Sequence, residues 1–218
     1  MAAREVLAEL STLYAAITGH AVNAEAAGGV EVARRVAAGE GADVVVLANT
    51  AIDKLIAEGH LQGGRVDLAR SGVAIAVRSG AARPDVSSEQ AVRRAVEAAR
   101  SLAYSTGPSG VHLEKLFERW GILPALKPRI VVPPPGVPVG TLVAGGQAEI
   151  GFQQLSELLT LPGIEVLGPL PPAIQTITTF SGGVGSRSTE AEAARALLDF
   201  MAAPAAAAIK QRFGMEPA

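Results

Sequence analysis

Apolar residues recur along this chain at two spacings, one helical and one typical of strands. Helical spacing first appears at Val6, Leu10, Leu13 and Ile17. Gly19 follows where a helix is expected to end. The run 43–48 is continuous and rich in β-branched residues, which is typical of a strand buried on both faces of a parallel sheet. The two spacings alternate almost to the C-terminus, and this order predicts an α/β architecture with helices on both faces of a sheet.

The other elements follow from the same two spacings. Strands are predicted at residues 20–25, 66–78, 101–104, 127–132, 148–152, 164–170 and 174–184. Helices are predicted to begin at or near Val30, Thr50, Ser88, Val111, Val139, Leu155 and Ala194, the last with a break at Pro204. Turns are predicted at Gly63-Gly64 and Gln153-Gln154, and a bend or crossover at Ser71-Gly72.

The segment Tyr104-Ser105-Thr106-Gly107-Pro108-Ser109-Gly110 joins a predicted strand to a predicted helix. The first turn of a helix exposes several backbone N–H groups and the positive end of the helix dipole. A loop of small hydroxyl residues and glycines at this place can therefore bind an anion without a charged side chain. The alternative is an ordinary N-cap, in which a Ser or Thr hydroxyl accepts a hydrogen bond from one of these N–H groups.

Small residues precede two other predicted helices in the same way. Gly28-Gly29 leads into the second helix, and Gly136-Val137 leads into the helix after the proline run 133–135. Gln153-Gln154 follows another predicted strand. In open α/β sheets, ligands bind where the carboxyl ends of strands meet the starts of helices. The convergence of these loops favours an anion site over unrelated helix caps.

Composition and charge argue against several other classes of function. The 218 residues carry a net charge of -2 and no basic run, which argues against nucleic-acid binding. There is no Cys, and His20, His60 and His112 lack the spacing of a metal site, so we expect no metal and no cofactor. No apolar run reaches the roughly 18 residues of a membrane span, so we expect no membrane insertion. The opening residues do not read as a secretory signal.

Three motifs occur in order along nearly the whole chain. They are Ala27-Gly28-Gly29 with Arg34-Arg35 and the stretch 38–46, then Gly107-Pro108-Ser109-Gly110-Val111, then Ala148-Glu149-Ile150-Gly151-Phe152-Gln153-Gln154. Together they resemble the molybdate-type solute-binding proteins, which have the type II periplasmic binding protein fold. The resemblance implies two α/β lobes with the ligand in a cleft between them. Lobe 1 would comprise residues 1–71 plus 176–218, and lobe 2 residues 72–175.

Two further expectations concern the hinge between the lobes and the N-terminal end of the chain. The resemblance implies a hinge at Ser71-Gly72 and at residues 174–179, where the two crossover strands run. The family begins with a strand and a small-residue loop before its first helix, and this first N-terminal strand is missing before Met1. A trimmed start would explain the difference.

The resemblance also implies which residues bind the ligand. The implied contacts are Gly28, Gly29, Ser105, Thr106, Ser109, Gly110, Gly136, Val137, Gln153 and Gln154. Most of them offer backbone N–H groups or hydroxyls, so the expected ligand is a small oxyanion or carboxylate. The molybdate binders have Tyr at the position of Gln154 and hydroxyl residues at those of Gly28 and Gly29. Fewer hydroxyl donors leave room for a ligand larger than molybdate.

Two functions follow from the resemblance. The first is a monomeric binding protein, periplasmic and not an enzyme, that passes a small anion to the membrane component of an ABC transporter. The alternative is an isomerase of small polycarboxylates on the same fold, similar to aconitate isomerase, which would suit a cytoplasmic chain. It would act by proton transfer, with His112 as the base and Arg34 or Arg70 as partner for a carboxylate. A ligand-sensing domain of a transcriptional regulator is a weaker third interpretation, because no helix-turn-helix segment is predicted.

Overall fold

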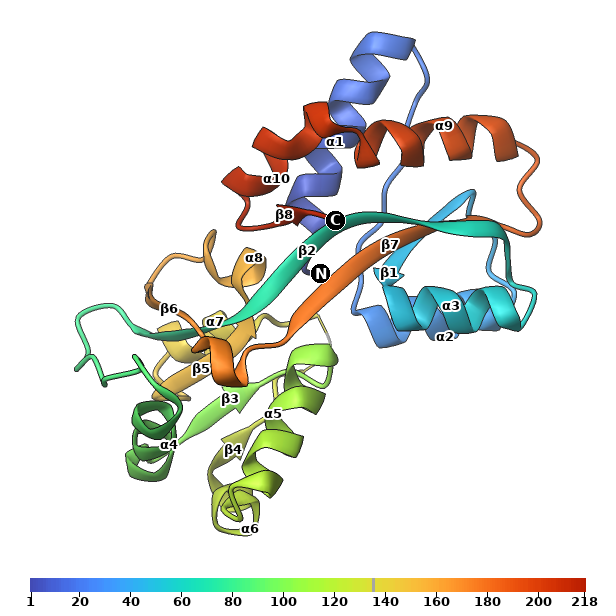
Figure 1. Ribbon diagram of the computed structural model, residues 1–218. Coiled ribbons are helices and arrows are strands. Elements are labelled where there is room, and N and C mark those ends of the chain that lie inside the picture. Colours follow the sequence, from blue (N-terminus) through green and yellow to red (C-terminus); the bar gives the residue numbers. More distant parts are fainter. Residues whose placement is uncertain (135) are drawn as a thin grey trace. The chain divides into compact units, whose positions relative to one another are not determined.

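The computed structural model describes residues 1–134 and 136–218. The chain divides into two compact units. Unit 1 comprises Met1–Ser71 and Thr178–Ala218, and unit 2 comprises Gly72–Ile177. Each unit has its own set of paired strands covered by helices, and one long strand, β2 (Leu61–Arg78), supplies residues to both (Figure 1).

In unit 1, β7 (Ile177–Gly185) lies between β1 (Val44–Ala48) and β2. β1 and β7 run antiparallel, and β8 (Glu216–Pro217) pairs antiparallel with β2. The helices of this unit are α1 (Arg4–Thr18), α2 (Gly29–Ala37), α3 (Asn49–Ala57), α9 (Ala191–Ala202) and α10 (Ala207–Arg212), with a 3-10 turn at Pro204–Ala206.

Both faces of the unit 1 sheet are covered by helices. Val45 and Leu47 of β1 are buried with Ile52 against α2 and α3. Val44 and Val46 alternate with them and pack against the core on the other face, to which α1 and α9 contribute. In Figure 1, α2 and α3 accordingly lie together on one side of these strands and α1 and α9 on the other. The continuous apolar run of β1 is therefore explained by burial on both faces.

In unit 2, the strand order is β6 (Ile164–Pro169), β2, β5 (Ile150–Gln154), β3 (Leu102–Tyr104) and β4 (Ile130–Val131). β3 is parallel to β4 and β5, whereas β2 is antiparallel to β5 and β6. One face packs against α4 (Glu89–Ala98), α5 (Pro108–Arg119) and α6 (Leu123–Leu126), and the other against α7 (Val139–Ala144) and α8 (Leu155–Leu158). Short 3-10 turns occur at Lys127–Arg129 and Pro172–Ile174.

The predicted strand at residues 20–25 is wrong. These residues have no regular structure and most are exposed. Their alternation depends on Ala21, Val22 and Ala24, of which Val22 packs against the core of unit 1. A strand requires a hydrogen-bonded neighbour, and none of the strands in the described residues pairs with this segment.

The predicted interruption of the 66–78 strand is also wrong. β2 is unbroken from Leu61 onward and includes both Ser71-Gly72 and Gly63-Gly64, the predicted turn. Gly63 has a φ of 69°, so an irregular residue is accommodated within the strand. Gly72 meets a packing requirement, because a Cβ there would lie 3.0 Å from Gln175 Nε2. The strand is therefore uninterrupted at Gly72, although the boundary between the two units falls between Ser71 and Gly72, where a bend or crossover was predicted.

Prolines shift several other boundaries. Residues 127–129 were predicted as strand but form a 3-10 turn around Pro128, which has no N–H to donate to a sheet. β7 begins at Ile177 and not at 174, because the turn Pro172–Ile174 precedes it. Gln153-Gln154, predicted as a turn, form the end of β5. The order of the predicted helices is confirmed. None of the helices in the described residues combines the length and apolar character that a bilayer span requires.

Candidate functional site

Two segments of unit 2 leave its sheet at the same edge. β3 and β5 run parallel, with Tyr104 opposite Phe152. β3 ends at Tyr104 and leads to α5, and β5 continues to Gln154 and leads directly into α8. The carboxyl ends of neighbouring parallel strands lie at one edge, which is where α/β sheets bind ligands. This edge therefore brings the start of α5 and the end of β5 together.

The start of α5 leaves backbone donors available. Gly107 is the N-cap residue, and no side chain caps the helix. Ser105 Oγ accepts a hydrogen bond from Gly107 N at 3.3 Å, before the helix begins. Pro108 has no N–H, so Ser109 and Gly110 supply the first N–H groups of the helix, which have no intrahelical acceptor. The ordinary N-cap alternative does not describe this helix.

Close packing fixes the shape of this loop. A Cβ on Gly110 would lie 1.6 Å from the carbonyl oxygen of Ser105, so only glycine allows the loop to fold back against the helix. Ser109 is 2% exposed and lies in the first turn of α5. Thr106 is exposed. The loop can offer an anion two N–H groups and one hydroxyl without a counter-charge.

Gln153 is bonded at both ends of its amide. Its Oε1 accepts a hydrogen bond from the N–H of Val139, the first residue of α7, at 2.9 Å. The amide also bonds the carboxyl group of Glu157 on α8. Burial raises the pKa of the Glu157 carboxyl, whereas the positive charge of the N-terminus and the weaker effect of the bond to Gln153 act in the opposite direction. Gln153 therefore orders α7 and Glu157, while Gln154 beside it is 2% exposed.

The other two predicted helix starts show fewer features that would favour anion binding. Gly136 is exposed with a φ of 81°, and Val137 N already donates to Pro134 O at 3.0 Å. Gly28 is the N-cap residue of α2 and Gly29 its first residue. A Cβ on Gly28 would meet nothing within 4 Å, so no packing requirement explains this glycine. Gly28 and Gly29 belong to unit 1, whereas the other predicted site residues belong to unit 2.

His112 is engaged in a structural contact. Its Nε2 lies 2.8 Å from the carbonyl oxygen of Ile174. A carbonyl can only accept, so Nε2 carries a proton and only Nδ1 remains as a base. Nearby, Gln175 bonds both backbone groups of Val73, with Oε1 2.9 Å from its N and Nε2 3.0 Å from its O. These contacts tie the segment around Ile174 and Gln175 to α5 and β2, and the sequence pattern gave no sign of them.

The two arginines proposed as carboxylate partners are also bonded. Arg34 forms a two-point contact with Glu31 on the same helix, at 3.0 and 2.7 Å. Arg70 Nε donates to the carbonyl oxygen of Pro217 at 2.9 Å. Both guanidinium groups therefore already have hydrogen-bond acceptors within the protein. No group of three or more potential metal-binding side chains occurs in residues 1–134 and 136–218.

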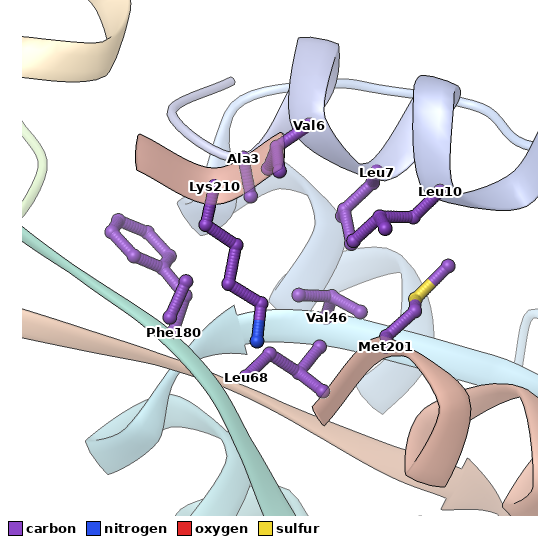
Figure 2. Close-up of a pocket in the computed structure, with 10 residues that line it drawn as sticks. Ala3, Val6, Leu7, Leu10, Val46, Leu68, Phe180, Met201 and Lys210 are labelled. Atoms are coloured by element: carbon purple, nitrogen blue, oxygen red, sulfur yellow. The ribbon is translucent and has the colours of Figure 1, made fainter. Parts of the chain in front are cut away.

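A small cavity in unit 1 contains a buried lysine (Figure 2). It has a volume of about 10 Å³ and is lined mainly by apolar side chains of α1, the sheet and α9. Lys210 of α10 points into it and is 1% exposed. Burial among these side chains lowers the pKa of Lys210. The cavity has room for about one water molecule, so it is too small for the expected ligand.

Comparison with known proteins identifies relatives of the whole chain. A family model described as bacterial extracellular solute-binding protein matches residues 1–216. Aconitate isomerase from Pseudomonas sp. is 44% identical over 187 residues, which are 84% of this chain and 70% of that protein.

Solved structures share the fold at lower identity. The periplasmic molybdate-binding protein of Azotobacter vinelandii has a TM-score of 0.79 and 23% identity, covering 98% of this chain and 94% of that one. PEB3 with L-phospholactate bound has a TM-score of 0.75 and 13% identity, covering 98% of this chain and 95% of that one; a Peb3 structure from Campylobacter jejuni is also similar. These likenesses confirm the predicted α/β fold of the periplasmic binding protein type. The chain therefore belongs to the bacterial extracellular solute-binding protein family.

Proposed function

We propose that this protein binds a small carboxylate or oxyanion at the start of α5. The observation that carries the proposal is the pair of N–H groups on Ser109 and Gly110, which no side chain caps. The hydroxyl of Ser109, a residue that is 2% exposed, can act as a third donor. Backbone donors fixed at a helix start can replace the hydration shell of an anion at little reorganisation cost.

A carboxylate is favoured as the ligand over molybdate. Aconitate isomerase, at 44% identity, is named for a tricarboxylate, and the L-phospholactate of the PEB3 structure carries both a carboxylate and a phosphate. Gly28 and Gly29 also lack the hydroxyls that molybdate binders have at these positions. We therefore expect cis- or trans-aconitate to raise the melting temperature more than molybdate, tungstate or sulfate at equal concentration.

Replacing the buried hydroxyl tests the site directly. We expect Ser109→Ala to weaken aconitate binding by about 10- to 100-fold, because a hydrogen bond to a charged group contributes roughly 1.5–3 kcal/mol. Isothermal titration calorimetry measures the change. Ser79→Ala is the matched control, since Ser79 is an exposed serine of the same unit, and its affinity should equal that of the wild type. Equal affinities of all three proteins would place the site elsewhere.

A second function, isomerisation of the bound polycarboxylate, is favoured by the 44% identity to aconitate isomerase. Incubation with cis-aconitate in D₂O distinguishes an isomerase from a receptor that only binds its ligand. An enzyme forms trans-aconitate, which proton NMR follows, and deuterium in the product shows whether the transferred proton exchanges with solvent before it is returned. A receptor binds cis-aconitate and returns it unchanged, so binding without conversion would exclude the isomerase and leave the binding function intact.

We also propose a setting for the binding function. A receptor of this family would deliver its ligand to the membrane component of an ABC transporter and work in the periplasm. Osmotic shock of cells that make the native gene product tests the location. Release together with a periplasmic marker supports the receptor role, and retention in the spheroplasts supports the alternative cytoplasmic location and contradicts the receptor role.

A further inference from the structure

We propose that Glu157 is the acid–base group that moves the proton during isomerisation of a bound polycarboxylate, an inference that rests on the isomerase function proposed above. Glu157 lies on α8, which begins directly after β5. β5 is the parallel neighbour of β3, and β3 leads to the start of α5. The carboxyl group therefore belongs to the same edge of the unit 2 sheet as the anion donors of Ser109 and Gly110.

Gln153 fixes the orientation of this carboxyl group. Because its Oε1 accepts from Val139 N, its Nε2 is the end that donates to Glu157. Gln153 itself is 3% exposed and cannot turn over without breaking the bond to α7. The carboxyl group of Glu157 is thus held by an amide, and the positive charge of the N-terminus also acts on it. An acid–base group needs this kind of fixed geometry.

The polar surroundings of Glu157 contain a second unused group. Ser156 is 5% exposed, and its Oγ has no hydrogen-bond partner among the described residues. A buried hydroxyl without a partner costs roughly 1–3 kcal/mol, which a bound ligand would recover. Ser156 and Glu157 follow each other on α8 and precede a buried Leu158. Both residues therefore lie in the single turn of α8, directly after the end of β5.

Competing proton acceptors in unit 2 are less suitable. His112 uses Nε2 to bond Ile174. Burial raises the pKa of Tyr104 to about 12, so its hydroxyl stays protonated at neutral pH. Glu114 is exposed and lies 3.4 Å from that hydroxyl. Burial instead raises the pKa of Glu157 above its ordinary value, against the opposing charge of the N-terminus. A shift in this direction suits a carboxyl group that must take up and return a proton.

The proposed isomerisation moves one proton and one double bond, with no net gain or loss of electrons. The Glu157 carboxylate takes a proton from the CH₂ carbon of cis-aconitate, which is acidified by its own carboxylate and by the neighbouring double bond. The C–H electron pair becomes the new double bond to the central carbon. The old double-bond pair moves to the distal CH carbon and takes the proton back from Glu157, which gives trans-aconitate and restores the carboxylate.

The test compares Glu157→Gln with Glu118→Gln, a control on the exposed side of α5. We expect Glu157→Gln to lower the rate of cis–trans conversion by at least about 100-fold, the usual contribution of general acid–base catalysis. Its dissociation constant for trans-aconitate, measured by calorimetry, should stay within a few-fold of wild type. Glu118→Gln should be fully active. Glu157→Asp keeps the acid and should retain part of the activity.

Three outcomes distinguish a failure of the proposed role of Glu157 from a failure of the proposed isomerase function. A wild type that binds aconitate without converting it overturns both the isomerase function and this inference. A wild type that converts aconitate as fast as Glu157→Gln overturns this inference alone. If Glu157→Gln fails to fold in a thermal melt, the rate of the folded Glu157→Asp variant decides, and an unchanged rate there overturns the inference.

Discussion

An alanine at position 110 should abolish anion binding and lower the free energy of unfolding by about 3 kcal/mol or more, above the usual cost of overpacking. The new Cβ would lie 1.6 Å from the carbonyl oxygen of Ser105 and 2.8 Å from its carbon. Both atoms belong to the backbone, so no side chain can move aside. The loop must shift, and the N–H groups of Ser109 and Gly110 must then turn away from the ligand. Urea denaturation and calorimetry measure the two effects.

Gly107→Ala is the matched control for this substitution. Gly107 has a φ of -77°, which any residue adopts, and its added Cβ would lie 3.5 Å from Ser105 Oγ, an ordinary contact. We expect stability within about 0.5 kcal/mol of wild type and unchanged affinity. If Gly110→Ala bound the anion as well as Gly107→Ala, the start of α5 would not be the site.

Replacing the buried Lys210 should change the free energy of unfolding in the opposite direction and stabilise the protein. Lys210 is 1% exposed in a cavity lined by Val6, Leu10 and Phe180, and none of the residues that line it is acidic. The ammonium form is disfavoured there, and each unit by which the pKa falls corresponds to about 1.4 kcal/mol. Methionine fills a similar volume without a charge. Lys210→Met should therefore raise the melting temperature at neutral pH.

The pH dependence of stability distinguishes this cause from better packing. The unfolded chain keeps Lys210 protonated up to about pH 10.5, its ordinary pKa, whereas the folded protein releases the proton at lower pH. Between these two values the unfolded state binds more protons, so wild-type stability should rise with pH by up to about 1.4 kcal/mol per unit. Lys210→Met should lack this rise. The exposed Lys54→Met should behave like wild type, and a parallel pH curve for Lys210→Met would contradict the explanation.

Local pattern was enough to predict most of the helices in order, though not α6, and the α/β class. The run 43–48 indicated a strand buried on both faces, and β1 has α2 and α3 on one face and α1 with α9 on the other. The part of the last predicted helix beyond the break at Pro204 corresponds to α10. Spacing could not predict that Lys210 faces inward, because the side that a short helix buries depends on distant elements such as α1.

The errors arise where a residue has a partner far along the chain. Gly72 was interpreted as a bend or crossover. The chain passes from unit 1 to unit 2 at this position, but the strand is not interrupted, and the glycine makes room for Gln175, which bonds Val73. Gln153 was interpreted as a turn residue facing the ligand, but its amide is bonded to Val139 and Glu157. Motif resemblance pointed to the start of α5, where Ser109 and Gly110 offer backbone N–H groups, and its role in ligand binding stays a prediction. It missed Glu157, since a lone acidic residue on a short helix carries no spacing signal.

The place of β7 in the sheet has a consequence for biosynthesis. β7 lies between β1 and β2, although it is made long after both. A chain emerging from the ribosome can complete unit 2 as one continuous segment, Gly72–Ile177, while the apolar faces of β1 and α1 wait for the C-terminal part. Nascent chains stalled before Thr178 should therefore hold a protease-resistant unit 2 and an unfolded N-terminal segment, which is where a chaperone would bind.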